Sequence, residues 1–378
     1  MQKRSSVLKL SLLLFVGLMI MMSGTAFAAV TPTQFVPGDT AVNRATGNQE
    51  TPAISHGNGV TLAVWSDHRS TPTTLGFQEF ETAGDIYGML LDASGNPLSS
   101  QPFPIAQGKA NQTTPRISWN GSNWLVLFQT TVLSGTGFYY ETALAAVRVS
   151  PTGQVLDPEP IRLYNTAPVG AAWTIASDGT DWIIVHQEGD LVAVRITADG
   201  QQQQPGTILV PRTYYLRFNL QLACASGTCL LTFNEQDNTG AIRFDSSFNV
   251  LGSGLFTLVN AAYVDALAAN GTGFYAVWSK QQADFSTALF GSRIDLNGNL
   301  LDGAGDILSA STFQGVSTGV LGWDGVNWRV AWSIPFTAYA ARVSAAGQVL
   351  DPGGVTLPGV TLGATAVTNN GSLQMVYS

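Results

Sequence analysis

The chain repeats a unit of about fifty residues, and each unit carries an apolar anchor a few residues after a turn glycine. Six of the seven anchors are aromatic, and the other is histidine. They are Trp65, Phe128, His186, Phe233, Trp278, Trp332 and Tyr377. A period of this length is typical of architectures in which each unit covers the hydrophobic face of its neighbour. The repeat therefore restricts the chain to an array or a ring of similar units.

An arginine and a second turn glycine five positions later mark most units again. The pairs are Arg148 with Gly153, Arg195 with Gly200, Arg293 with Gly298, and Arg342 with Gly347. Arg243 stands in the same place before Phe248, and Leu90 replaces the arginine in the first unit. A residue that recurs in every unit belongs to the scaffold, since a reacting group acts at one place. We expect the anchors to form the core and the arginines to pair with carboxylates or backbone carbonyls between units.

The segments between turns are short and rich in branched and aromatic residues, which predicts strands and no helix in the mature chain. Each unit contains an inner strand, a second strand ending at the anchor, a third carrying the arginine and a fourth. We therefore predict an all-β, seven-bladed β-propeller over residues 29–378, its last blade closed by N- and C-terminal strands. The predicted blades are about 51–107, 112–165, 170–211, 219–260, 263–310 and 315–359, with a closing blade of 362–378 plus 33–45. Gln201 to Gln204 are interpreted as a solvated loop.

Residues 1–28 have the features of a secretory signal peptide. Lys3, Arg4 and Lys9 flank the start of an apolar core at 10–22, and Ala26 and Ala28 supply the small-x-small cleavage pattern. A membrane anchor is the alternative, but a spanning helix needs ~18–20 apolar residues. We predict a secreted or periplasmic protein.

The charge of the chain limits its partners. A net charge of −8 disfavours nucleic acid, which requires a basic face, and also disfavours anionic membrane surfaces. We expect a monomer that is not inserted in a membrane and that has an unknown glycan or protein ligand.

Residues 64–98 carry the clearest sequence resemblance. They contain Trp65-Ser66-Asp67-His68-Arg69, Asp85-Ile86-Tyr87-Gly88 and Gly95. With the repeated Asn-Gly hairpins, this stretch resembles the blades of secreted bacterial β-propeller repeat proteins. The resemblance implies the fold and export. It implies no activity, because that group shares none.

Cys224 and Cys229 flank four residues, Ala-Ser-Gly-Thr, at the tip of a predicted hairpin. Opposed strand positions at a hairpin tip lie within disulfide distance. An even cysteine count in an exported chain favours oxidation, and a redox or metal pair would need Cys-x-x-Cys spacing. We predict a structural disulfide.

No catalytic motif or metal site emerges from the sequence. Gly315 to Gly319 match G-x-S-x-G, but no helix follows to form the nucleophile elbow. His56, His68 and His186 lack the clustering of metal ligands, and His186 occupies an anchor position. No metal or other cofactor is therefore assigned. Calcium held by acidic loop residues such as Asp67, Asp85 or Asp237 is left open.

Aromatic residues on the longer loops are the candidate ligand contacts, because binding usually lies on varied loops of a rigid scaffold. The candidates are Phe77, Phe80, Tyr139, Tyr140, Tyr214, Tyr215, Asp265 and Phe285. The alternative is that half of these rings pack the loops.

Two-carboxylate hydrolysis is disfavoured by the predicted inner strands. Asp265 is their one acid, and Glu50, just before the first, lies on a non-adjacent unit. We therefore expect an exported non-catalytic binding or scaffold module for glycan or protein. A glycoside hydrolase or lyase acting on extracellular polysaccharide is the alternative, and a structural surface role is the third.

Overall fold

The computed structural model describes residues 49–69, 84–108, 110–133, 140–164, 172–215, 217–309, 312, 316–334, 337–357, 365–369 and 372–376. These residues lie in one unit of the chain, residues 43–378. Their regular elements are all strands. No helix long and apolar enough to cross a membrane occurs among them.

Six antiparallel sheets of four strands each form blades 1 to 6. Blade 1 contains β1 (Gln49–Gly57), β2 (Val60–Asp67), β3 (Asp85–Leu91) and β4 (Phe103–Ala106). Blade 2 contains β5 (Asn111–Trp119), β6 (Trp124–Leu133), β7 (Tyr140–Val149) and β8 (Ile161–Tyr164). Blade 3 contains β9 (Trp173–Ser177), β10 (Trp182–Glu188), β11 (Asp190–Ile196) and β12 (Gln202–Val210).

Blade 4 contains β13 (Arg217–Ala225), β14 (Thr228–Glu235), β15 (Asn238–Asp245) and β16 (Phe256–Val259). Blade 5 contains β17 (Tyr263–Ala269), β18 (Phe274–Gln281), β19 (Thr287–Ile294) and β20 (Asp306–Ile307). Blade 6 contains β21 (Ser317–Trp323), β22 (Asn327–Ile334), β23 (Thr337–Ser344) and β24 (Val355–Leu357). A two-stranded sheet follows, with β25 (Thr365–Asn369) and β26 (Ser372–Val376).

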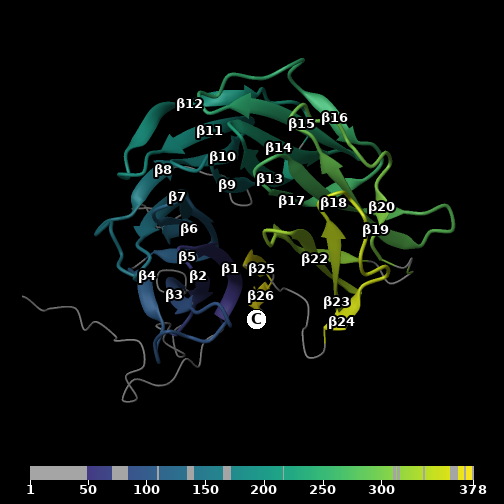
Figure 1. The fold of residues 1–378 in the computed structure, drawn as a ribbon. Helices are drawn as coiled ribbons and strands as arrows, with labels where there is room; N and C mark the ends of the chain where they lie inside the picture. The colour runs from purple at the N-terminus through teal and green to yellow at the C-terminus, as the bar shows by residue number, and fades with distance from the viewer. Residues whose placement is uncertain are drawn as a thin grey trace, which may run out of the picture. The chain divides into compact units, whose positions relative to one another are not determined.

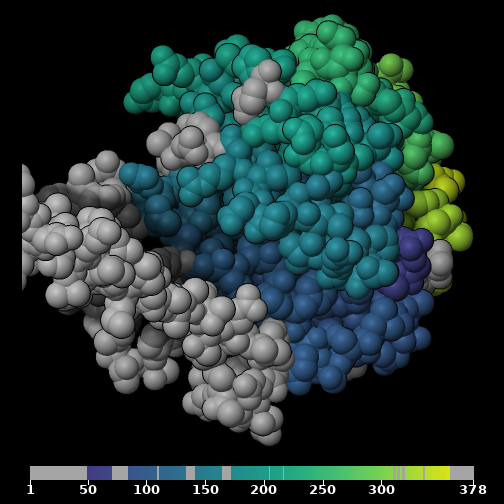
Figure 2. Space-filling model, turned by 90° about the vertical axis from the view of Figure 1, so that its left-hand side faces the viewer, coloured from purple at the N-terminus to yellow at the C-terminus, as the bar shows by residue number. Residues whose placement is uncertain are grey.

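The first strand of each blade lies innermost, and neighbouring inner strands contact one another in chain order. The series runs from β1 through β5, β9, β13, β17 and β21 to β25, which contacts β1 again (Figure 1). The blue and teal atoms of blades 1 to 3 form one continuous surface in the space-filling view (Figure 2). The predicted all-β propeller is therefore confirmed.

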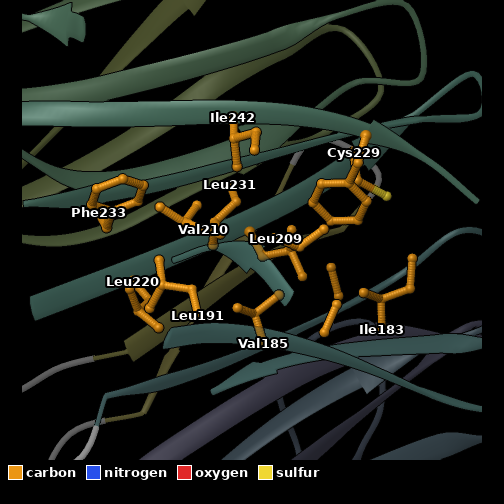
Figure 3. Close-up of a cluster of buried hydrophobic side chains, with 14 residues drawn as sticks. Ile183, Val185, Leu191, Leu209, Val210, Leu220, Cys229, Leu231, Phe233 and Ile242 are labelled. Carbon is orange, nitrogen blue, oxygen red and sulfur yellow. The ribbon is translucent and has the colours of Figure 1, made fainter. Parts of the chain in front are cut away.

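Each blade is covered on both faces, which explains why its central strands are apolar without alternation. In β10, Trp182, Ile183, Ile184 and Val185 have no exposed surface. Ile183 and Val185 pack against blade 4, whereas Trp182 and Ile184 pack against blade 2. Figure 3 shows the cluster between blades 3 and 4, in which side chains from both sheets interdigitate.

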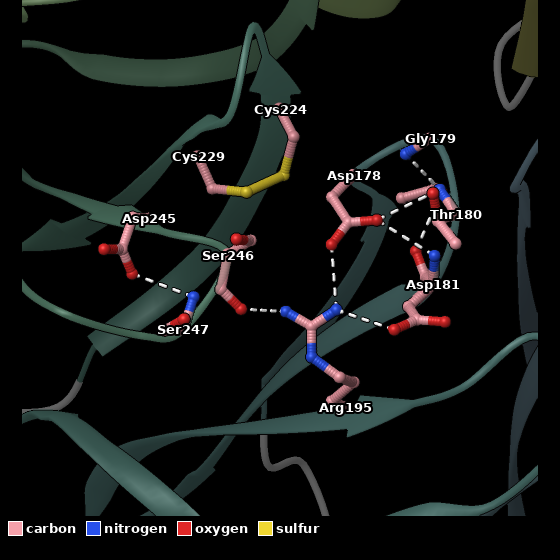
Figure 4. The surroundings of a disulfide bond; sticks show 11 residues. Asp178, Gly179, Thr180, Asp181, Arg195, Cys224, Cys229, Asp245, Ser246 and Ser247 are labelled. Carbon is pink, nitrogen blue, oxygen red and sulfur yellow. Dashed lines mark hydrogen bonds and ion pairs between the residues drawn. A yellow bond between two sulfur atoms is a disulfide. The ribbon is translucent and has the colours of Figure 1, made fainter.

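The repeated arginines connect consecutive blades, as the sequence predicts. Arg148 of blade 2 donates to the Ala198 carbonyl oxygen of blade 3 at 3.0 Å, and its own blade holds it through Asp157. Equivalent contacts to the next blade follow along the chain. They are Arg195 to Ser246 (Figure 4), Arg243 to Leu296 and Arg293 to Ala345.

The later turn glycine makes room for the arginine of the preceding blade. A β-carbon on Gly347 would lie 2.7 Å from Arg293 Nε. Phe248 occupies the same position in blade 4, and there Arg195 lies over its ring at 5.3 Å. The same type of arginine contact therefore joins these blades, whether the turn residue is glycine or phenylalanine.

The prediction of seven blades is wrong, because the structure has six four-stranded blades and one two-stranded sheet. The arginine contact that joins consecutive blades is absent on both sides of that sheet among the described residues. Arg342 of blade 6 makes no contact to a following turn among the described residues, and nothing lies within 4 Å of a β-carbon placed on Gly95 of blade 1. Among the described residues, the sheet β25–β26 has no third strand that would carry an arginine. The proposed closing segment 33–45, the anchor Tyr377 and the signal peptide 1–28 lie outside the described residues.

Two local predictions have opposite outcomes. Cys224 and Cys229 face each other across β13 and β14 and form a disulfide, which confirms the prediction (Figure 4). A loop is expected at Gln201 to Gln204, but β12 already begins at Gln202, which pairs with Ile196. Polar side chains are tolerated in that strand because it is the outer edge of the sheet.

Candidate functional site

A pocket of about 440 Å³ lies on blade 4, and we refer to it as the blade 4 pocket. Three separate segments form it: the connection before β13, the β14–β15 hairpin and the start of β16. Its lining residues are Thr213, Tyr214, Tyr215, Phe233, Glu235, Gln236, Asn238, Gly240, Leu255, Phe256 and Thr257. The set combines aromatic walls with a few polar groups, which is the usual composition of a small-molecule site.

Glu235 is the one carboxylate among these lining residues. It is the last residue of β14 and pairs with Asn238, so a tight hairpin turn fixes its backbone. Its Oε1 accepts a hydrogen bond from the Thr213 hydroxyl and lies 3.4 Å from Arg217 Nε. Both contacts converge on Oε1, and no hydrogen bond from a described residue reaches Oε2. That oxygen is the free acceptor of the pocket.

Arg217 supports Glu235 from behind the pocket wall. Its side chain is 1% exposed, it lies over the Phe233 ring at 5.1 Å, and its Nη1 donates to the Pro211 carbonyl oxygen at 2.9 Å. A buried arginine is stable only when its charge is compensated. Glu235 supplies that charge, so the ion pair restricts where the carboxylate can lie.

Two tyrosines form the open side of the pocket. Tyr214 is 96% exposed and Tyr215 is 51% exposed, and their rings meet edge to face at 5.7 Å. The opposite wall depends on Gly240, since a β-carbon there would lie 2.7 Å from the Phe233 ring. Rings with one apolar face and one hydroxyl suit ligands that combine flat apolar faces with polar edges.

The β14–β15 turn is held from the neighbouring blade. Tyr263 of β17 donates a hydrogen bond from its hydroxyl to the Gln236 carbonyl oxygen. Gln236 has a φ of 55°, a backbone conformation that non-glycine residues adopt mainly in tight turns. The hairpin carrying Glu235 is therefore fixed by contacts on both sides.

The structure brings together two of the eight candidate ligand residues, Tyr214 and Tyr215. Phe77, Phe80 and Tyr139 lie outside the described residues, and Tyr140 begins β7 opposite Leu133. Phe285 is 76% exposed in the β18–β19 turn of blade 5, away from the pocket lining.

Asp265 is also placed away from the pocket, on the inner strand β17. Its Oδ2 accepts a hydrogen bond from the Ser279 backbone N–H at 3.1 Å, so it caps its own blade. Glu50 lies on β1, 3.8 Å from His68 Nε2, and β1 and β17 are not neighbouring inner strands. The described inner strands therefore give no adjacent pair of carboxylates.

Two of the residues considered for calcium are committed to the scaffold of blade 1. Asp67 has no exposed surface and accepts hydrogen bonds from Arg69 and from Trp65 Nε1. Burial alone would raise the pKa of Asp67, and these hydrogen bonds hold it below its usual value. Asp85, opposite Asp67 on β3, is buried as well. Among the described residues no group of three or more His, Cys, Asp or Glu side chains is arranged to hold a metal ion.

Glu235, Thr213, Gln236 and Asn238 of the pocket lining are not among the residues predicted from the sequence. They lie on or next to the tight hairpin of residues 234–240 or on the connection before β13. The sequence feature that could have indicated them is the polar run Asn234-Glu235-Gln236-Asp237-Asn238, which directly follows an apolar anchor strand. Its proximity to Tyr214 and Tyr215 arises only in the folded chain.

Neither a family model nor a curated protein matches the chain in sequence. The predicted resemblance to secreted bacterial propeller repeats thus stays a prediction. Several solved structures are similar in fold. An exo-β-1,3-galactanase from Phanerochaete chrysosporium, solved with galactose, shares 10% identity over 81% of this chain and 71% of its own, with a TM-score of 0.41.

A GH43_1 enzyme from Xanthomonas citri, complexed with xylose, shares 10% identity over 68% of this chain and 90% of its own, with a TM-score of 0.38. A prolyl endopeptidase shares 14% identity over 82% of this chain and 41% of its own, with a TM-score of 0.46. With TM-scores below 0.5, these similarities do not assign an activity to this chain.

The structures found include glycoside hydrolases, the class that the sequence analysis gives as the alternative, and they do not support the expectation of a non-catalytic module. That expectation rests on the carboxylates of the inner strands alone, whereas Glu235 lies at the end of a second strand and lines a pocket.

Proposed function

We propose that the protein is a glycoside hydrolase that acts on extracellular polysaccharide at the blade 4 pocket. The observation that carries the proposal is the free Oε2 of Glu235 inside a pocket walled by Tyr214 and Tyr215. Tyrosine rings stack on the apolar faces of sugars, and polar groups such as Gln236 and Asn238 suit their hydroxyls.

Hydrolysis of a glycosidic bond requires one group that takes a proton from water and one that protonates the leaving oxygen. We assign the first role to Glu235, because Thr213 and Arg217 hold its Oε1 and leave Oε2 as acceptor. Water then attacks the anomeric carbon as its proton passes to Oε2. The C–O bond breaks, and a hydroxyl of Tyr214 or Tyr215 gives its proton to the leaving oxygen.

Export is part of the same proposal. The disulfide Cys224–Cys229 is typical of oxidising compartments, and the signal pattern at residues 1–28 predicts delivery there. A secreted or periplasmic enzyme would meet polysaccharide directly.

The test is a hydrolysis screen that measures reducing ends released from neutral and acidic polysaccharides. The wild-type protein is expected to release sugar from at least one of them. Glu235→Gln should lower kcat at least ~100-fold, the usual contribution of a general base. Glu159→Gln is the matched control, because Glu159 is exposed on blade 2. A wild-type protein that binds polysaccharides but hydrolyses none of them contradicts the proposal.

A further inference from the structure

Arg116 occupies an unusual place for a cation, on the inner strand β5. It follows a bulge at Thr114 and Pro115, where the pairing with β6 shifts register, and it lies opposite Leu127. Directly opposed residues project from the same face of a sheet. Leu127 packs in the cluster between blades 2 and 3, so Arg116 projects toward blade 3 at the inner edge of its own blade.

Arg116 is partly buried and has no hydrogen bond or ion pair with any described residue. The buried and partly buried arginines elsewhere in the described chain do have partners. Six are in ion pairs: Arg69, Arg148, Arg195, Arg217, Arg293 and Arg329. Arg243 donates to the Leu296 carbonyl oxygen instead. Burial lowers the pKa of Arg116, which reflects the cost of an uncompensated charge away from water.

Polar residues occupy the same register position on the next two inner strands. Thr174 lies opposite Val185 on β9, and Gln221 lies opposite Thr232 on β13. The equivalent residues in the other three blades are apolar: Ala53, Ala266 and Val320. Because β5 contacts β9 and β9 contacts β13, Arg116, Thr174 and Gln221 lie at one level on three adjacent inner strands.

The next level of the inner strands is apolar and separates these residues from the far end of the ring. Ile117, Ile175, Leu222 and Leu267 line a cavity of about 400 Å³ together with the following residues of each strand. Arg116 is not part of that lining. Arg116 therefore lies beside this apolar lining and outside it. Thr174 projects toward blade 4, because Val185 opposite it packs between blades 3 and 4, so Thr174 shares the level of Arg116 but does not face it.

We propose that Arg116 binds an oxyanion, the carboxylate, phosphate or sulfate group of a small ligand. A guanidinium forms two parallel hydrogen bonds to such a group. The bound anion would supply the countercharge that no described residue supplies. This site is independent of Glu235 and of the proposed hydrolysis.

The test compares thermal unfolding of the wild type, Arg116→Met and the control Arg162→Met, whose arginine is exposed on β8. Inorganic phosphate, sulfate, glucuronate and uncharged glucose are titrated at constant ionic strength. At least one anion should raise the Tm of the wild type and of Arg162→Met in a saturable way, while glucose has no effect. Arg116→Met should not respond, and without anion its Tm should exceed that of the wild type because an unpaired charge has been removed.

Three results overturn the proposal: no anion shifts the wild type, all variants respond equally, or Arg116→Met lowers Tm without anion. The last result would mean that Arg116 has a structural role. Arg116→Lys gives a second measure if the methionine variant does not fold. It keeps the charge but loses the planar fork, so its apparent anion affinity should fall at least tenfold, and an unchanged affinity also overturns the proposal.

Discussion

A β-carbon on Gly200 of blade 3 would lie 2.8 Å from the guanidinium of Arg148, which reaches across from blade 2. Glycine at this turn is thus required by an arginine from another blade, in addition to its φ of +90°. The same relationship joins Gly347 to Arg293. It explains why an arginine and a glycine recur together in most units.

Gly200→Ala should therefore lower the free energy of unfolding by about 2 kcal/mol or more in total, which exceeds the cost of backbone strain alone. The matched control is Gly271→Ala, with a φ of +85° and nothing within 4 Å of the added β-carbon. In a double-mutant cycle followed by chemical denaturation, Arg148→Ala should relieve part of the Gly200→Ala cost. Strictly additive effects would show that the two residues are not coupled.

The disulfide makes a separate contribution to stability. Cys224→Ser should lower the free energy of unfolding by about 2 kcal/mol, the loop-closure entropy expected for so short a ring. The double variant Cys224→Ser/Cys229→Ser should cost the same, because either change removes the one bridge. Thiol titration of the folded wild type checks the premise, and two reactive thiols would refute it.

His186 makes stability depend on pH. It is 3% exposed, and burial lowers its pKa to about 4 from an ordinary 6.5. In the unfolded chain His186 therefore becomes protonated below pH 6.5, whereas in the folded chain it stays neutral down to about pH 4. Stability contributed by neutral His186 is present above pH 6.5 and is lost as the pH falls toward 4, at up to about 1.4 kcal/mol per pH unit.

His186→Phe should flatten this part of the profile, since phenylalanine is the anchor at the equivalent positions of blades 2 and 4. Denaturant unfolding at pH 7 and pH 5 measures the difference between wild type and variant. Comparing the two proteins at each pH removes the contribution of His56, whose pKa burial also lowers. An equal pH dependence in both proteins would contradict the assignment.

Much of the fold could be predicted because its determinants are local and repeated. Turn glycines, anchors and the arginines recur in the sequence, and Cys224 and Cys229 lie on one hairpin. The number of complete blades could not be predicted. The last unit has only two strands among the described residues, and the way such a unit is completed depends on segments far away in the sequence. Of the pocket residues, Tyr214 and Tyr215 could be predicted from the sequence as candidate ligand contacts. Glu235 joins them only through strand pairing in blade 4, which composition does not reveal.

Tyr214 and Tyr215 should contribute to substrate binding more than to folding. Tyr214 is almost fully exposed, so Tyr214→Ala should change Tm little and raise KM about tenfold, the loss expected for one stacked ring. Phe285→Ala on blade 5 is the control for removing an exposed ring elsewhere. Equal effects of the two substitutions on KM would place the substrate outside the blade 4 pocket.

The most direct test of the central claim compares binding and turnover in Glu235→Gln on a polysaccharide that the wild type hydrolyses. Calorimetric titration should give a Kd within a few-fold of the wild type, because the tyrosine walls are unchanged, while kcat falls at least ~100-fold. Glu159→Gln should retain both. A Glu235→Gln protein that still hydrolyses the polysaccharide at a rate near that of the wild type would contradict the assignment of Glu235 as the reacting carboxylate.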